Sequence, residues 1–489
     1  DEAKAFLSSQ DPNKRMKLID QLLSSDGYAS NYFNYFADIL RLLTKGRDGI
    51  AGQAYADWLK TSLRENKHYD VMVKELLTTD GAAWDSGAIG FYTRDRGMPL
   101  DHLAATVQVF LGTRIECAQC HNHPFDKWTQ MDYYQMAAFT YGMDTRNYGI
   151  DPKKMFGTVD RKNTEARKAY QEVREVLGEV MKPLRYTAIS PNGKLPQLPH
   201  DYQYDDAKPK QTIEPKTMFG HEVVAKEGQT MLQGFGDWMT SPDNPRFTTV
   251  IANRLWKRVM GMGLMEPVDE ITDSTVASNP ELMSYLEKLM IAKNYNLKSY
   301  LRVLLNSDVY QRMPSQKDVD LGEEYFFTGP LMRRMSAEQI WDSVVTLLVG
   351  NVDTRAAEPD AQSAARLAAL ETLHDSIARK TGDELLAAVR AKDGNDPDKA
   401  RTIARQIAQL QRGSKGDAFV TILGTEGAQT FQTMMRDAGK SDKKSSAKNI
   451  GAAQVSMSKE EIRKMMDEGM DKKEIRAKVE EMKKVAKAA

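Results

Sequence analysis

The sequence predicts a mainly α-helical, multidomain protein with a cysteine–histidine motif between two helices and an extended proline-rich connector. Apolar residues recur every three to four positions along most of the chain, which is the period of an amphipathic helix. The chain has 489 residues, 41% of them hydrophobic, so it can build more than one core. Prolines cluster over residues 183–215 and exclude a long helix there.

Local signals place the first helices on either side of the motif. Asp11 and Pro12 are suited to the cap and first turn of a helix. Gly112 ends a helix expected at 100–111, and a short turn then leads to the cysteines. An aromatic-rich helix is expected at 132–139, after the motif. Asn279-Pro280 and Ser336 mark two later helix starts.

Changes in composition divide the chain into regions. Alanine-rich charged segments predict a helical hairpin, and a lysine-rich stretch predicts a linker before two short amphipathic helices. Residues 361–411 and 458–489 are the segments expected to form a homo- or hetero-oligomer. The predicted regions are 1–150, a helical domain with the motif; 151–228, a helix and the connector; 229–350, a second helical domain; 351–438, the hairpin region; and 439–489, the linker and helical tail.

The two cysteines of the chain, Cys117 and Cys120, stand in one motif, Cys-Ala-Gln-Cys-His. This is C-x-x-C-H, the attachment pattern of a c-type haem. Two thiols one helical turn apart can add to the two vinyl groups of the porphyrin, and the imidazole of His121 can bind the iron. The motif therefore predicts one covalent haem held by Cys117, Cys120 and His121.

The same residues allow other chemistry. Cys117, Cys120 and His123, with or without His121, could hold zinc through thiolate and imidazole ligands. The pair could also be a redox-active dithiol, or could close into a disulfide in a protein without redox function. The helical surroundings disfavour the dithiol, which usually lies in a βαβ unit.

If haem is bound, the second axial ligand decides its potential. Met136 follows the motif on a helix, as do Met131 and Met143 nearby, and a thioether would raise the potential. His102, on the preceding helix, would lower it. His123 is too near His121 in the chain to cross to the other face of the ring, so it is expected beside the site or as a zinc ligand.

Composition excludes several classes of function. Lys plus Arg and Asp plus Glu number 68 each, so no overall charge favours nucleic acid. No apolar stretch is long enough to span a bilayer. Phosphate-binding loops, H-E-x-x-H and G-x-S-x-G do not occur. An electron-transfer or structural protein is therefore favoured over an enzyme with its own substrate.

Several stretches carry a resemblance to a known pair of domains. Residues 110–139, with the motif, resemble the planctomycete cytochrome C-like domain, DUF1549. Residues 238–256, 306–311 and 333–339 are similar to the DUF1553 domain that follows it. The resemblance implies an exported helical protein of Planctomycetes or related bacteria that binds one haem through Cys117, Cys120 and His121. We then expect a periplasmic or cell-surface location, a removed targeting segment, and a redox partner protein or larger assembly.

Overall fold

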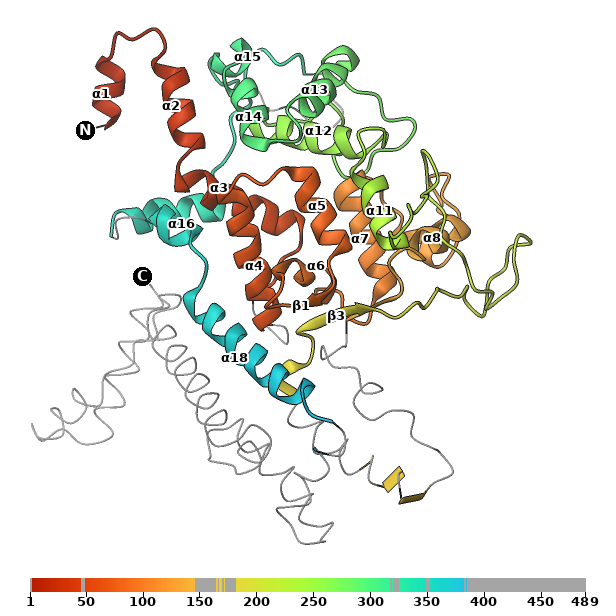
Figure 1. Cartoon of the computed structure of the whole chain (residues 1–489). Helices are drawn as coiled ribbons and strands as arrows, with labels where there is room; N and C mark the ends of the chain where they lie inside the picture. The colour runs from red at the N-terminus through yellow and green to blue at the C-terminus, as the bar shows by residue number, and fades with distance from the viewer. Residues whose placement is uncertain are drawn as a thin grey trace, which may run out of the picture. The chain divides into compact units, whose positions relative to one another are not determined.

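The computed structural model describes residues 2–44, 49–145, 182–316, 325–348 and 352–381, together with a few isolated positions. These residues belong to the first of two compact units of the chain, Asp1–Phe431; the second is Gln432–Ala489. The fold is mainly helical, as the sequence predicts (Figure 1). None of the described helices has the length and apolar character needed to cross a membrane.

The first part of the described chain, residues 2–145, contains the motif and the helices before and after it. Its α-helices, short strands and 3-10 turns are α1 (Glu2–Ser8), α2 (Lys14–Leu23), α3 (Asp26–Ile39), α4 (Gly49–Arg64), α5 (Tyr69–Thr78), β1 (Gly81–Ala82), η1 (Gly87–Ile89), α6 (Gly90–Thr93), α7 (Pro99–Leu111), η2 (Glu116–Gln119), α8 (Gln130–Ala137) and β2 (Met143–Asp144).

The later part is helical again after a stretch with little regular structure. Its elements are η3 (Lys182–Leu184), β3 (Ala188–Pro191), α11 (Met231–Thr240), α12 (Phe247–Met260), α13 (Pro280–Ala292), α14 (Leu297–Leu305), α15 (Asp308–Gln311), α16 (Ala337–Thr346), α17 (Val352–Ala357) and α18 (Ala361–Ala378).

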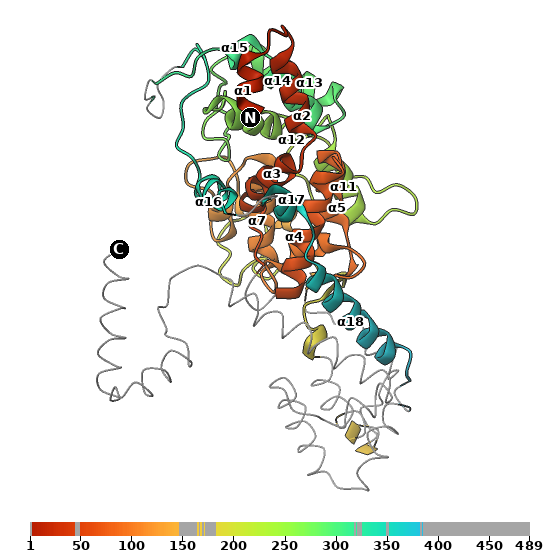
Figure 2. The ribbon, with the colours of Figure 1, turned by 90° about the vertical axis from the view of Figure 1, so that its left-hand side faces the viewer.

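One hydrophobic cluster runs through helices from both parts. It contains Phe36 of α3 and Leu59 of α4 together with Phe247 of α12 and Tyr300 of α14. Helices α12 to α15 lie together in both views, and α12 also packs against α7 (Figures 1 and 2). Residues before 150 and after 229 therefore share a core, and the domain limits drawn from composition stay predictions.

Helix α7 leads directly to the motif. Pro99 occupies its first turn, where a missing backbone N–H costs nothing, and most of its residues from His102 to Leu111 are buried. Gly112 ends it with φ 58°, the left-handed conformation that favours glycine, and its N–H donates to the Gln108 carbonyl at 3.2 Å. The predicted end of this helix is thus confirmed.

Three helix starts predicted from capping residues can be compared with the structure. Asn279 and Ser336 cap α13 and α16 through their side chains, as predicted. The first expected start is wrong by two residues, because α2 begins at Lys14. Asp11 instead accepts a hydrogen bond from the Asn13 N–H at 2.8 Å, so this segment forms a turn before the helix.

The strands form a small antiparallel sheet with the order β1-β3-β2. Gly81 pairs with Ile189, and Met143 pairs with Pro191. Between β3 and α11 the described backbone contains no helix and one isolated bridge, Gln197 with Thr212. This stretch carries Tyr204 to the motif.

Helix α18 packs against α4 and η3 of its own chain. This accounts for its fully buried apolar side chains, among them Leu370 and Leu373. The remainder of the predicted hairpin, the lysine-rich linker and the helical tail lie outside the described residues.

Candidate functional site

Cys117, Cys120 and His121 lie on one exposed turn, formed by η2. Both thiols are free and exposed, whereas Ala118 between them is fully buried in the hydrophobic core. The N–H groups of Cys120 and His121 donate to the Cys117 carbonyl at 3.2 and 3.3 Å. The structure therefore brings these three predicted site residues together, with Ala118 anchoring the turn.

Hydrogen bonds from two sides hold the residues next to this turn. The Asn122 N–H donates to the Tyr204 hydroxyl at 2.7 Å, and Asn122 Oδ1 accepts from the Gln130 N–H at 2.9 Å. Gln130 Nε2 donates to the Gln119 carbonyl at 3.0 Å. The connector and the start of α8 therefore both fix the backbone around His121.

The contacts of His121 assign its proton. Nδ1 lies 2.7 Å from the Asn122 carbonyl oxygen, which can only accept a hydrogen bond. Nδ1 must therefore carry a proton, so in the neutral form of this exposed ring the lone pair is on Nε2. A metal-binding histidine typically donates its other ring N–H to a carbonyl in this way.

His123 has the opposite arrangement. Its Nδ1 accepts a hydrogen bond from the Phe125 N–H at 3.3 Å, so in the neutral ring Nε2 carries the proton. A metal could bind Nδ1 only after this hydrogen bond breaks. His123 stays a predicted ligand, but its contacts fit that role less well than those of His121.

His102 and Met136 are both enclosed in the interior. Met136 is fully buried in α8 as part of the hydrophobic core. The His102 ring lies between Phe91, with ring centres 4.8 Å apart, and Tyr92, at 4.3 Å. A bond from Met136 to a group on the exposed thiols would require the core to open, and His102 borders a cavity whose lining does not include the cysteines. Among the described residues, no three or more His, Cys, Asp or Glu side chains are grouped closely enough to hold a metal ion.

Two polar residues of α12 bond backbone groups outside their own helix, and one of them, Arg254, contacts α7, the helix before the motif. Arg254 donates to the carbonyl oxygens of Val109 and, at 3.1 Å, Gln108. The side chain of Asn253 is fully buried and bonds both the N–H of Leu264, at 2.8 Å, and the carbonyl of Met265, at 2.7 Å. The Arg254 contacts join α12 to the end of α7 that precedes the motif. The Asn253 contacts join α12 to the loop that follows it.

The fold and the site together define a mainly helical protein that presents a Cys-x-x-Cys-His turn at its surface. Residues 1–145 match a family model described as PSCyt2, protein of unknown function (DUF1549). Residues 233–468 match a second, PSD1, protein of unknown function (DUF1553). The chain thus carries a DUF1549 region followed by a DUF1553 region, in the predicted order. Neither a curated protein nor a solved structure matches the chain.

Sequence reasoning missed several contributors to the site. Tyr204 was not among the predicted site residues, yet its hydroxyl accepts a hydrogen bond from the backbone next to His121. Arg254 and Asn253 are polar residues in the middle of an apolar helix, and that contrast is the signal that could have identified them. Asp95 lies in an Arg-Asp-Arg run, and nothing local shows that it reaches His102.

Proposed function

We propose that this protein binds one haem c through the thiols of Cys117 and Cys120, with His121 Nε2 as an axial ligand, and serves electron transfer or redox sensing. The observation that carries the proposal is the 2.7 Å contact between His121 Nδ1 and the Asn122 carbonyl. Because Nδ1 donates to this carbonyl, Nε2 of the neutral ring is unprotonated, and it lies on the edge of the ring opposite this contact.

The residues of the turn fit this group. Both cysteines are free and exposed, so they are accessible to a porphyrin approaching from solvent. When bound, haem supplies a one-electron redox couple. The chain supplies the attachment through Cys117 and Cys120, and the Asn122 contact orients His121. His102 and Met136, the other predicted ligands, take structural positions in this proposal because they are enclosed in the interior.

The surface beside the turn favours a protein partner. Phe125 is 92% exposed, four residues after His121 in the chain. An aromatic side chain in this position is typical of a surface that another protein covers. We therefore infer a redox partner protein or a larger assembly that docks over Phe125 and the motif, in the periplasm or at the cell surface, where thiols are joined to haem.

The decisive experiment is a pyridine haemochrome spectrum combined with the intact mass of protein purified from its native source. The proposal expects a c-type spectrum and the added mass of one haem. Replacing both thiols, with Cys117→Ser and Cys120→Ser, should remove the added mass. Unmodified mass without visible absorption would overturn the proposal.

Matched histidine variants test the axial ligand. His121→Ala should change the visible spectrum of the attached haem, because the iron loses an imidazole. His123→Ala should leave it unchanged, because His123 is proposed to make only backbone contacts. A spectrum that responds to His123 and not to His121 would contradict the assignment.

The alternative is a binding or structural protein in which the same turn holds zinc or closes into a Cys117–Cys120 disulfide. The exposure of both thiols favours it equally, since either product can form at the surface. A colourless protein that contains stoichiometric zinc and loses stability with a chelator would support the metal form. A mass lower by two hydrogen atoms before reduction would support the disulfide.

A further inference from the structure

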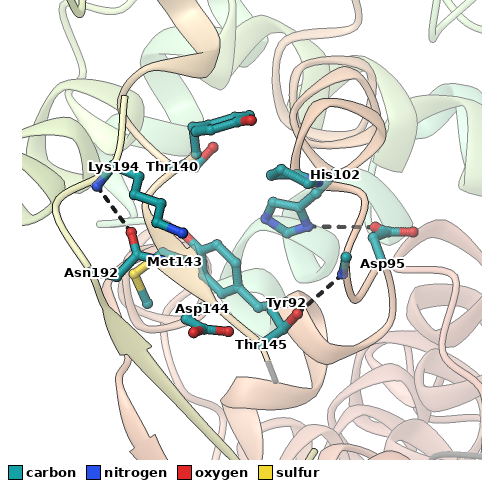
Figure 3. Close-up of a pocket in the computed structure, with 12 residues that line it drawn as sticks. Tyr92, Asp95, His102, Thr140, Met143, Asp144, Thr145, Asn192 and Lys194 are labelled. Atoms are coloured by element: carbon teal, nitrogen blue, oxygen red, sulfur yellow. Dashed lines mark hydrogen bonds and ion pairs between the residues drawn. The ribbon is translucent and has the colours of Figure 1, made fainter. Parts of the chain in front are cut away.

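A cavity whose lining includes no residue of the motif lies beside the buried His102. It has a volume of about 310 Å³ and opens between α7, the residues around β2 and the turn after β3 (Figure 3). Ligand pockets of roughly this volume hold small molecules. Polar side chains line much of this cavity, among them those of Asp95, His102, Thr140, Asp144 and Lys194.

His102 is the buried polar group of this cavity. Its Nδ1 lies 3.4 Å from Asp95 Oδ2, a charge contact without the geometry of a hydrogen bond, and its Nε2 has no hydrogen-bond partner among the described residues. The free edge of the ring faces the cavity, opposite the side that meets Asp95 (Figure 3). A buried ring nitrogen without a partner costs free energy unless a bound molecule satisfies it.

The electrostatics keep this imidazole neutral. Burial lowers the pKa of His102, and the nearby Asp95 carboxylate opposes that shift without cancelling it. Asp95 is itself paired with Arg41 and, at 3.3 Å, with Arg94. With its proton on Nδ1, facing Asp95, the neutral ring presents Nε2 to the cavity as an acceptor.

Two further groups define what the cavity can recognise. Thr140 Oγ1 is buried and also lacks a hydrogen-bond partner in the part of the chain that the structure describes. Lys194 lies on the exposed turn after β3, and its side chain extends toward the cavity from the side opposite His102 (Figure 3). The buried end of the cavity thus offers His102 Nε2 as an acceptor for a hydroxyl group of a ligand. The exposed end offers the cation of Lys194.

We propose that this cavity binds a small hydroxy acid of about monosaccharide size, with its anionic group on Lys194 Nζ and a hydroxyl group donating to His102 Nε2. Thr140 Oγ1 binds a second oxygen of the same molecule. Asp144 also lines the cavity, and its carboxylate disfavours ligands with more than one negative charge. A monoanion rich in hydroxyl groups therefore fits best.

Isothermal titration of the full chain with D-glucuronate tests the proposal. We expect binding at least about tenfold tighter than that of D-glucose, which lacks the anion, or of hexanoate, which lacks the hydroxyl groups. Lys194→Met should weaken glucuronate binding about tenfold and leave glucose unchanged. Lys208→Met, an exposed lysine outside the cavity, is the matched control.

A second variant addresses the buried end. Thr140→Val has nearly the same shape as the native residue, so the protein should fold and still lose about tenfold in affinity for glucuronate. Saturable binding that falls in both variants and not in the control supports the site. The proposal is overturned by no measurable binding of glucuronate at about 10 mM, or by equal affinities in all variants.

Discussion

Arg254 in α12 donates a hydrogen bond to the carbonyl oxygen of Val109 in the last turn of α7. It also donates to the Gln108 carbonyl at 3.1 Å. The last carbonyl groups of a helix lack donors within it, so the guanidinium supplies a donor to Val109 and adds a second one to Gln108, which already accepts from the Gly112 N–H. Because α12 belongs to the DUF1553 region and α7 to the DUF1549 region, this contact joins the two close to the motif.

Replacing this buried cation should destabilise the fold. Arg254→Met retains the length of the side chain but leaves the buried Val109 carbonyl without its Arg254 donor, so we expect a loss of about 2 kcal/mol in the free energy of unfolding. Urea denaturation measures it. Arg302→Ala is the control, because Arg302 makes an exposed ion pair with Asp20 and should change stability little. Equal effects of the two variants would contradict the capping role.

The hydroxyl of Tyr204 should order the turn around His121. Tyr204→Phe removes the acceptor for the Asn122 N–H, and we expect a loss of about 1 kcal/mol. The amide of Asn122 should also exchange its hydrogen faster with solvent, as hydrogen-exchange mass spectrometry can detect in the peptide that contains it. Tyr285→Phe, at an exposed position, is the matched control. Unchanged exchange at Asn122 would show that the turn is held by its other contacts.

Both thiols should react without unfolding. Cys117 and Cys120 are exposed, so reduced, haem-free protein should take up two iodoacetamide adducts in the absence of denaturant. Cys117→Ser should take up one. Protein that carries haem on both thiols should take up none. Modification of the reduced, haem-free protein only after urea is added would contradict the exposed position of the motif.

Gly112 should tolerate no side chain. A Cβ at this position would lie 2.8 Å from Val250 Cγ2, and φ 58° is unfavourable for other residues. We expect Gly112→Ala to cost about 2 kcal/mol, from backbone strain and overpacking against α12. Gly193 has a similar φ of 69° with open space around it, so the stability lost in Gly193→Ala measures the cost of the backbone conformation alone. A smaller loss in Gly112→Ala than in Gly193→Ala would argue against the close approach of α12.

Stability should fall in mild acid because of His102. Its folded pKa is depressed by burial below the ordinary value of 6.5, so below pH 6.5 the unfolded chain binds more protons than the folded one. The free energy of unfolding should therefore decrease as pH falls below 6.5, while Asp95 and its partner Arg41 stay charged. Urea denaturation across this range should show a shallower decrease in His102→Gln. The exposed control His200→Gln should retain the native slope, and equal slopes in both variants would exclude His102 as the cause.

The sequence by itself determined the helical class, several helix limits and the residues of the motif. Helix periodicity and caps such as Ser336 with Gln339 are local, and they act through neighbours along the chain. The Cys-x-x-Cys-His spacing is local too. The order of the DUF1549 and DUF1553 regions follows from short stretches for the same reason.

Only the tertiary structure decided which helices meet and which partners His102, Arg254 and Asn122 have. Arg254 and Asn122 find Val109 and Tyr204 in distant segments of the chain, and His102 meets Asp95 across the turn that precedes α7. Burial and hydrogen bonds to such partners set protonation and orientation, and no local pattern encodes them. The cavity beside His102 exists for the same physical reason, because packing brings α7 and the turn after β3 to its opposite sides.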